Sequence, residues 1–487
     1  MEQRPLGDYE RYSLARHNVG HAPAVVFTAQ LASDSDSLSP RALVTAIHTL
    51  LTREPLLSSS IPDPTAETPH YRLERDLDPA DVLVELDRIG HAGADDDALL
   101  DGLRAINDLD LTCAPLWRVF LYRSDPATKR TRIAVATHHT LCDGTASRNL
   151  FVEILTLLRT TPSPPSAESV ARPFPPSLEA TVDVKVSKFL LLQTFLSSLV
   201  TPYLPSFLCT PLTPCWPNPA VVPPLGRPTA LESFFLSAEL SLALSTVAKS
   251  HSVKTLHPVL VTAAAMAIAN VVSRRDPDRS SPLVVSSQSP VSLRSSDLGH
   301  TSSVTGNYIS SVAHALPAVT PEYLASTSFW SETRAYAEHS RRPATLDRAT
   351  KGMGMLAFLP ASTARDREQG RTGWERYLED AMARDANPWK GGSFEVSNLG
   401  RLPDFGPEWE RHGRVEGVCW AQPASGTGPG LSFNTVSSGG VLACTVSWRK
   451  DSIHAETVEE IVEAFRKILV KIAQGKVAEN TSVGDLS

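Results

Sequence analysis

Hydrophobic and polar residues alternate with two different periods along this chain, and the mixture predicts both strands and helices. In the first third, residues 24–31, 116–122 and 132–137 are short runs rich in β-branched and aromatic side chains, which is typical of strands. Residues 125–129 have the Asp-Pro-Ala-Thr-Lys sequence of a turn, so the second and third runs are expected to form a hairpin.

Two helices are expected in the same region. Ser39 followed by Pro40 is a favourable start for the first, because serine caps the helix and proline suits its first turn. The second is expected over residues 145–159. Each has large apolar residues on one face, as a surface helix requires: Leu43, Ile47, Leu50 and Leu51 in the first, and Phe151, Ile154, Leu155 and Leu158 in the second.

Proline divides the chain. Fifteen of its 38 prolines lie in residues 162–228, a density that no regular element tolerates, so this region is expected to be a connection. One apolar helix is expected within it, near residues 184–200. The predicted organisation is an N-terminal lobe over residues 1–180, a crossover over 181–228 and a C-terminal lobe over 229–487.

The second half of the chain continues the mixture of elements. Its pattern predicts helices over 238–250, 256–273 and 457–472, and strands over 231–236, 283–287, 304–315, 393–397, 431–436 and 441–448. The Gly439-Gly440 pair makes the last two strands a hairpin. Two α/β lobes with mixed sheets, joined by a long crossover, fit this order.

Charge and cysteine content exclude several classes of function. The net charge is −7, with 46 basic and 53 acidic residues dispersed along the chain, so no nucleic-acid partner is expected. The six cysteines form no C-x-x-C pair and are sparse for 487 residues, which argues against a disulfide scaffold or a structural zinc site. Free thiols in a reducing compartment are the expectation.

Membrane attachment has little support in the sequence. The N-terminus lacks the apolar core of a secretory signal. We identify residues 189–208 as the only long apolar stretch, and polar residues together with Pro202 and Pro205 interrupt it. A buried helix or lid is favoured over an interfacial helix, so a cytoplasmic protein is expected, with peripheral contact to a membrane or lipid droplet as the alternative.

The sharpest chemical signal is the run AVATHHTLCDG, residues 134–144. His138 and His139 end a predicted strand, and Asp143-Gly144 precedes a predicted helix. A strand end holds a side chain rigidly, and glycine lets the chain turn tightly beside it. A neutral imidazole, with an ordinary pKa near 6.5, can take the proton of an alcohol as its oxygen attacks a carbonyl. A thioester is already activated, so this chemistry requires neither a metal nor a serine nucleophile.

Other interpretations of these residues stay open. The two histidines could be structural, and Asp143 could be a solvated turn residue. A His-His-x-x-x-Asp metal site would resemble the three-ligand pattern of catalytic zinc. However, adjacent residues on a strand point to opposite faces, so His138 and His139 rarely reach one ion, and no metal is expected.

The spacing resembles that of a known family. His138-His139-x-x-x-Asp143-Gly144 matches the HHxxxDG motif of the chloramphenicol-acetyltransferase-like superfamily, which includes nonribosomal peptide condensation domains and fungal alcohol O-acetyltransferases. The resemblance implies that His139 is the general base and that Asp143 is structural and pairs with an arginine, for which Arg294 is the candidate. It also implies two lobes in a V shape with a tunnel between them, and acetyl-CoA or another acyl-CoA as co-substrate, with no permanently bound cofactor.

Further segments extend the resemblance across nearly the whole chain. Residues 4–7 and 10–16 look like the opening of fungal alcohol acetyltransferases, and residues 115–118, 256–260, 290–294, 306–308 and 397–400 resemble later family segments. The candidate substrate-binding residues are Arg294, Asn307, Ser397, Asn398, Ser432 and Asn434, of which Ser432 and Asn434 are candidate donors to an oxyanion.

These features predict an acyltransferase of secondary metabolism that moves an acetyl or other acyl group from acyl-CoA to the hydroxyl of a small or amphiphilic alcohol. An amine acceptor or a carrier-protein donor is an alternative, although the DFGWG signature of condensation domains is absent, which favours a freestanding enzyme. A non-catalytic binding protein on the same fold is a third reading. A monomer is expected, because two lobes in one chain can build the site.

Overall fold

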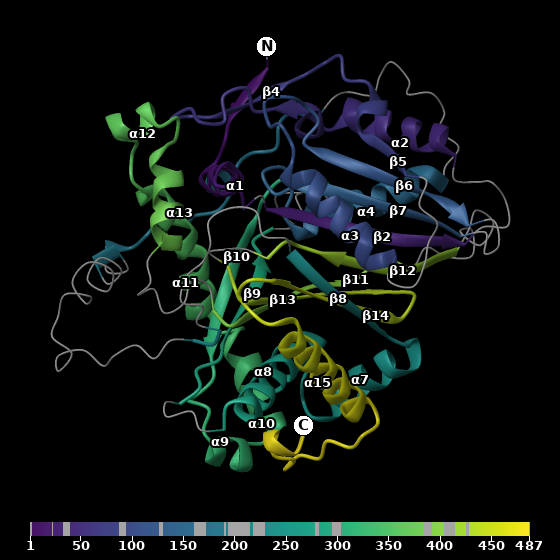
Figure 1. Cartoon of the computed structure of the whole chain (residues 1–487), viewed down its shortest axis with the longest axis vertical. Coiled ribbons are helices and arrows are strands. Elements are labelled where there is room, and N and C mark those ends of the chain that lie inside the picture. The colour runs from purple at the N-terminus through teal and green to yellow at the C-terminus, as the bar shows by residue number, and fades with distance from the viewer. Residues whose placement is uncertain are drawn as a thin grey trace.

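The computed structural model of the chain describes residues 2–21, 23–32, 39–86, 94–125, 130–159, 172–188, 191–192, 215–217, 229–277, 282–294, 303–383, 392–403, 414–424 and 428–486. Within these residues the chain forms two α/β lobes, each built around its own large sheet (Figure 1). The N-terminus lies at the outer end of the first lobe and the C-terminus at the outer end of the second.

The first lobe contains a five-stranded sheet. In spatial order its strands are β12 (Arg414–Ala421), β2 (Ala24–Ala32), β7 (Arg130–His138), β6 (Trp117–Asp125) and β5 (Leu83–Leu86). All neighbours are antiparallel except β5 and β6. Its helices are α2 (Pro40–Arg53), α3 (Ala94–Asn107) and α4 (Gly144–Arg159).

Helices cover both faces of this sheet. Gly102 of α3 lies so close to Val26 and Ala136 that a Cβ there would be 2.6 Å from the Val26 side chain. Phe27, the next residue on β2, points to the other face and stacks on Phe151 of α4. The central strands β2 and β7 are therefore buried on both sides, which explains their nearly continuous apolar sequences.

Strand β12 joins the two lobes. It comes from residues 229–487, the predicted C-terminal lobe, yet pairs with β2 in the first sheet. Its Trp420 stacks on Phe27 and donates its indole N–H to the backbone oxygen of Thr435 on the second sheet, at 3.0 Å. The C-terminal part of the chain thus contributes strands to both sheets. The predicted boundaries at residues 180 and 228 stay a prediction.

The second lobe contains a six-stranded mixed sheet. In spatial order its strands are β10 (Ile309–Ala315), β9 (Ser286–Ser292), β11 (Phe394–Arg401), β13 (Leu431–Ser438), β14 (Val441–Arg449) and β8 (Thr229–Leu236). β11 is parallel to β9 and β13, and the other pairs are antiparallel. Below it in Figure 1 lie α7 (Ala238–Ser250), α8 (Leu256–Arg275), α10 (Phe329–His339) and α15 (Ala455–Ala473).

Alternation along β11 gives the second sheet one apolar and one polar face. Phe394 and Val396 are fully buried in the core that α8 and α15 complete. Glu395 and Ser397, between and after them, point to the opposite face because successive side chains on a strand alternate. That polar face is turned toward the first lobe, and the site described below lies there.

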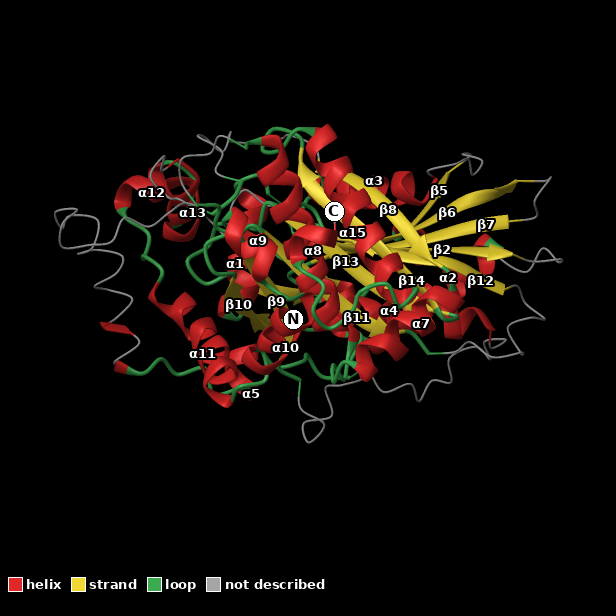
Figure 2. Cartoon of the chain, turned by 90° about the horizontal axis from the view of Figure 1, so that it is seen from below, coloured by secondary structure: helices red, strands yellow, loops and turns green. Residues whose placement is uncertain are grey.

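The remaining elements lie around these two sheets. A small sheet contains β1 (Gln3–Pro5), β4 (His70–Leu73) and β3 (Ser59–Ser60), and the other helices are α1 (Asp8–Asn18), α5 (Leu178–Thr181), α9 (Pro321–Ser326), α11 (Pro343–Met353), α12 (Ala364–Glu368) and α13 (Gly373–Ala383). Ala15 and Val19 attach α1 to α13 through a small core with Trp374 and Leu378. Figure 2 shows the strands of the first sheet fanning out at one side, with α11, α12 and α13 at the other.

Most of the predicted elements are confirmed, with three corrections. The strand predicted over 283–287 begins only at Ser286, because Leu283 and Val284 form isolated bridges, and the one predicted over 304–315 begins at Ile309. Residues 189–208 were wrongly taken as the only long apolar stretch. Helix α8 is equally long, at 20 residues, and is apolar enough to span a membrane by length and composition, yet 83% of its most apolar part is buried inside the protein. The predicted helix near 184–200 and the turn at 126–129 lie largely outside the described residues.

Candidate active site

The two histidines of the motif point to opposite sides of the first sheet. His138 is the last residue of β7, and the backbone N–H of His139 continues the pairing by donating to Pro23 at 2.9 Å. His139 lies in the turn that the Leu141 N–H closes on the His138 oxygen at 3.0 Å, and the two rings have different neighbours. His139 lines a cavity between the lobes, whereas His138 packs against α1.

Asn307 fixes which nitrogen of His139 carries the proton. The Asn307 amide donates both hydrogens, to the backbone oxygens of His139 and Thr140, each at 2.8 Å. Its Oδ1 therefore faces the imidazole, and Nδ1–H of His139 must donate to it, at 3.1 Å. This tautomer leaves the lone pair on Nε2, which makes no hydrogen bond within the described part of the chain. The geometry is that of a general base.

Both ring nitrogens of His138 are hydrogen-bonded to protein groups. The backbone N–H of Thr140 donates to its Nδ1 at 3.1 Å, so the proton must reside on Nε2, which donates to His17 Nδ1 at 3.2 Å. The ring is fully buried and does not line the cavity. The motif makes His138 a candidate catalytic residue together with His139, but the structure gives His138 a supporting position, with both ring nitrogens bonded to protein groups. No group of three His, Cys, Asp or Glu residues in the described ranges is arranged to hold a metal ion.

The surroundings of His139 keep its imidazole neutral. Burial lowers the pKa of His139 below its ordinary 6.5, the Asp143 carboxylate opposes this shift, and the charge of Arg16 adds to it. The ring of Tyr9 meets His139 edge-on, with centroids 5.8 Å apart. A base with a lowered pKa is in its proton-accepting form throughout the neutral range.

A pH profile follows from this shift. We expect kcat/KM to be flat through neutral pH and to fall, with unit slope, only when the pH drops through the lowered pKa of His139 below 6.5. kcat/KM falls toward acid because protonation of His139 removes the lone pair on Nε2. Initial rates in constant-ionic-strength buffers would measure the profile. An acid limb centred above pH 6.5 would contradict it.

Asp143 and Arg294 form a buried ion pair between the lobes. Arg294 Nη1 lies 2.5 Å from Asp143 Oδ2, and the two side chains are 3% and 1% exposed. The same carboxylate accepts the backbone N–H of Tyr308 at 2.8 Å and, through Oδ1, that of Ala146 at 2.9 Å, which caps α4. The expected pairing is therefore present. Arg294 does not line the cavity, so its proposed role in substrate binding is corrected to a structural one.

Two glycines allow close contact at this junction. Gly306 forms a bridge with Cys142 and has φ +97°, and a Cβ on it would lie 2.6 Å from the Tyr308 ring. Gly144 begins α4 at the cavity wall, where a Cβ would lie 3.0 Å from Leu399. Side chains at either position would separate the elements that hold His139 and Asp143.

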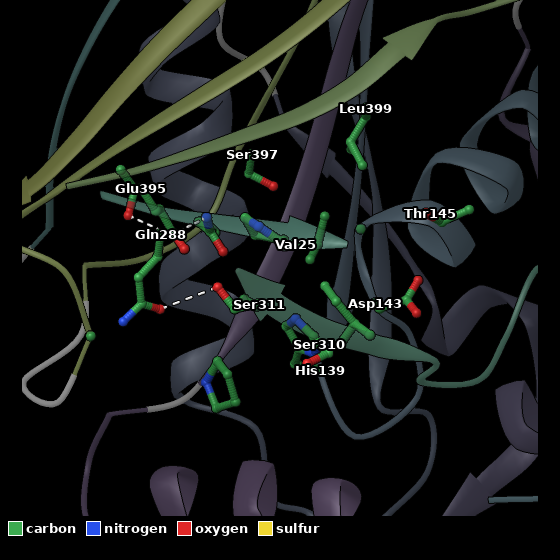
Figure 3. Close-up of a pocket in the computed structure, with 18 of the residues that line it drawn as sticks. Val25, His139, Asp143, Thr145, Gln288, Ser310, Ser311, Glu395, Ser397 and Leu399 are labelled. Carbon is green, nitrogen blue, oxygen red and sulfur yellow. Dashed lines mark hydrogen bonds between the residues drawn. The ribbon is translucent and has the colours of Figure 1, made fainter. Parts of the chain in front are cut away.

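The cavity has a volume of 450 Å³ and takes its walls from both lobes (Figure 3). The first lobe contributes α1, the start of β2, His139 and the start of α4. The second contributes the polar face of its sheet. Polar residues of the second sheet that line the cavity are Gln288, Ser292, Ser310, Ser311, Glu395, Ser397, Asn398 and Ser432. A cavity of this size accommodates a drug-sized molecule or part of a larger one.

The structure brings only some of the predicted binding residues to this cavity. Ser397, Asn398 and Ser432 line it, although the Asn398 side chain also accepts the Gly400 N–H, as in a turn. Asn307 positions His139, as described above. Asn434 is 1% exposed and does not line the cavity, and its amide hydrogens reach the backbone oxygens of Ser432 and Thr445. Its predicted role as an oxyanion donor is corrected, because those hydrogens are already engaged.

The sequence analysis missed four polar residues of the cavity wall that bear on its chemistry. Glu395 and Gln288 lie side by side on β11 and β9, and Gln422 follows β12. Arg16 reaches the cavity from α1, a helix that was not predicted. The alternation of Phe394, Glu395, Val396 and Ser397 could have indicated a polar sheet face, but nothing local indicates that this face meets His139.

Comparison with known proteins agrees with this architecture. The sequence matches no protein-family model and no curated protein. Among solved structures, the trichothecene 15-O-acetyltransferase of Fusarium sporotrichioides aligns over 97% of this chain and 95% of its own, with TM-score 0.66 and 12% identity. Polyketide synthase associated protein 5 of Mycobacterium tuberculosis aligns over 97% and 98%, with TM-score 0.61 and 15% identity.

A third similar structure is the epimerization domain from the third module of tyrocidine synthetase B. It aligns over 99% of this chain and 98% of its own, with TM-score 0.59 and 16% identity. At these identities the likeness establishes the fold. The chain has the two-lobe, mixed α/β fold of condensation domains and chloramphenicol-acetyltransferase-like proteins, as the sequence predicted.

Proposed function

We propose that this protein is an acyltransferase that moves an acetyl or other acyl group from acyl-CoA to the hydroxyl of a small or amphiphilic alcohol. The observation that carries the proposal is the His139 imidazole. Its proton is held on Nδ1 by Asn307, so the Nε2 lone pair is available at the wall of a cavity between the lobes. The similarity to a two-lobe acetyltransferase supports the same class of reaction.

In the proposed reaction, Nε2 of His139 accepts the proton of the acceptor hydroxyl while its oxygen attacks the thioester carbonyl. The tetrahedral intermediate then collapses, the C–S bond breaks, and the imidazolium returns the proton to the leaving thiolate. Asp143 stays paired with Arg294 throughout and serves to hold the loop after β7. The donor enters and leaves as a co-substrate, so no permanently bound group is needed.

The test is release of free thiol from acetyl-CoA in the presence of a panel of alcohols. We expect alcohol-dependent release with the wild-type protein and release at least about 10²-fold slower with His139→Ala. Release that needs an amine acceptor, or a loaded carrier protein as donor, would replace the corresponding substrate in the proposal. Equal rates for wild type and His139→Ala would overturn it.

A further inference from the structure

One carboxylate on the cavity wall has no part in the proposed proton transfer. Glu395 lies on β11 between Gln288 of β9 and Ser432 of β13, and the strand registers put the three residues in one row across the sheet. All three line the cavity. Figure 3 shows Glu395 and Gln288 projecting into the same space that His139 borders.

Two donors hold one oxygen of this carboxylate. The Ser432 hydroxyl donates to Oε1 at 2.8 Å, and the Gln422 amide donates to the same atom at 2.5 Å. Gln422 also donates to Oδ1 of Asn434, at 3.1 Å, which fixes the amide in turn. The carboxylate is therefore oriented, while Oε2 of Glu395 makes no hydrogen bond within the described ranges. Oε2 is therefore available to accept a hydrogen bond from a ligand in the cavity.

The charge near Glu395 is balanced without a direct ion pair. Burial raises the pKa of Glu395, and the Ser432 hydrogen bond and the positive charge of Arg16 lower it. No ion pair joins Glu395 to any cation among the described residues, and Arg16 Nε is buried without a hydrogen-bond partner. A carboxylate oxygen at the cavity wall that no protein group engages is expected to bond to a donor of the ligand when the cavity fills.

The charges of Glu395 and Arg16 favour an uncharged hydrogen-bond donor as the ligand group that Glu395 binds. A ligand ammonium would add a second cation beside Arg16, whereas a hydroxyl donates a hydrogen bond without adding charge. The Gln288 amide nitrogen, which also has no hydrogen bond among the described residues, can donate to the oxygen of the same hydroxyl. We propose that Glu395, with Gln288, binds a second hydroxyl of the acceptor, so that the enzyme prefers diols and polyols over mono-alcohols.

This inference rests on the proposed function and is tested with matched acceptors. The probes are linear α,ω-diols of four to ten carbons, 1-alkanols of the same lengths, and the corresponding ω-amino alcohols, each with acetyl-CoA. Corrected for two equivalent hydroxyls, wild-type kcat/KM is expected to favour the diol over the mono-alcohol by about tenfold at one best length. The preference should reside in the acceptor KM, because binding rather than proton transfer distinguishes the two.

Substitutions of Glu395 and Ser432 distinguish an effect on binding of the second hydroxyl from an effect on folding. Glu395→Gln is expected to remove most of the diol preference, because Ser432 and Gln422 keep the amide oxygen and turn its N–H toward the cavity. Ser432→Ala frees the carboxylate to rotate and is expected to reduce the preference by a smaller factor. Glu463→Gln, on α15 outside the cavity and with its side chain 44% exposed, is the matched control. Melting temperatures establish that each variant is folded.

The outcomes distinguish the two proposals. If mono-alcohols and diols are acetylated equally well in a His139-dependent reaction, or if folded Glu395→Gln and Ser432→Ala keep the diol preference, the inference about Glu395 fails alone. A preference for amino alcohols would overturn the charge argument. If no acceptor gives His139-dependent release, the proposed function fails. Saturation-transfer NMR on His139→Ala then still tests diol recognition, which should be stronger than mono-alcohol binding and lost with Glu395→Gln added.

Discussion

Replacing His139 with alanine is expected to lower kcat/KM for acyl transfer by about 10²- to 10⁴-fold, the usual contribution of a general base. The reason is geometric. The hydrogen bond to Asn307 occupies Nδ1 of His139, so the lone pair on Nε2 stays available at the cavity. His138 cannot substitute, because both of its ring nitrogens are engaged behind the strand. Thiol release at saturating acetyl-CoA measures the effect.

Two further variants test whether the loss of activity in His139→Ala comes from removing the general base. His48→Ala, at an exposed position of α2, removes an imidazole without touching the cavity and should leave the rate unchanged. Asn307→Ala removes the group that selects the tautomer, so it should give an intermediate loss in kcat with His139 still present. A His139→Ala protein that is folded and retains more than about a tenth of the activity would show that base catalysis is not the main contribution.

Breaking the Asp143–Arg294 pair is expected to be the most destabilising change near the site. Asp143→Asn should lower the free energy of unfolding by about 3–5 kcal/mol, because it leaves the Arg294 guanidinium buried without a counter-charge. The affected contacts join α4 to the segment around Tyr308, so the loss should reach both lobes. Denaturant unfolding, with comparison of midpoints and slopes, measures it.

The controls for this prediction use a second substitution and a surface pair. Asp143→Asn combined with Arg294→Met removes both charges and should cost less than the sum of the two single changes by about 0.5–3 kcal/mol. Arg342→Met breaks the exposed pair with Glu338 and should cost less than about 1 kcal/mol. If Asp143→Asn is no more harmful than Arg342→Met, the buried pair does not stabilise the junction.

Local patterns were sufficient for much of the fold. Ser39 and Pro40 predicted the start of α2, and the Ser39 hydroxyl does accept the Ala42 N–H, at 3.2 Å. The β13–β14 hairpin was predicted from Gly439-Gly440, and both residues have positive φ angles, 55° and 84°. Capping and tight turns depend on residues within a few positions of each other, which is why sequence alone predicts them.

Long-range pairing was not predictable in the same way. β12 joins the first sheet beside β2, almost 400 positions earlier in the chain, and no periodicity in residues 414–421 indicates that partner. α1 was missed because its two faces differ little in polarity, although it supplies Arg16 to the cavity. Glu395 has the ordinary signature of an alternating strand, and only the packing of the lobes places it in the same cavity as His139.

The amino-acid sequence by itself was enough to propose His139 as the base and to predict the turn that follows it and the two-lobe α/β class, because these depend on residue type and on spacing within one segment. The tertiary structure decided which His139 nitrogen carries the proton, whether Arg294 reaches Asp143, and which polar face borders the cavity. Each of these depends on atoms from segments 150 or more positions apart, brought within hydrogen-bond distance by the packing of two sheets.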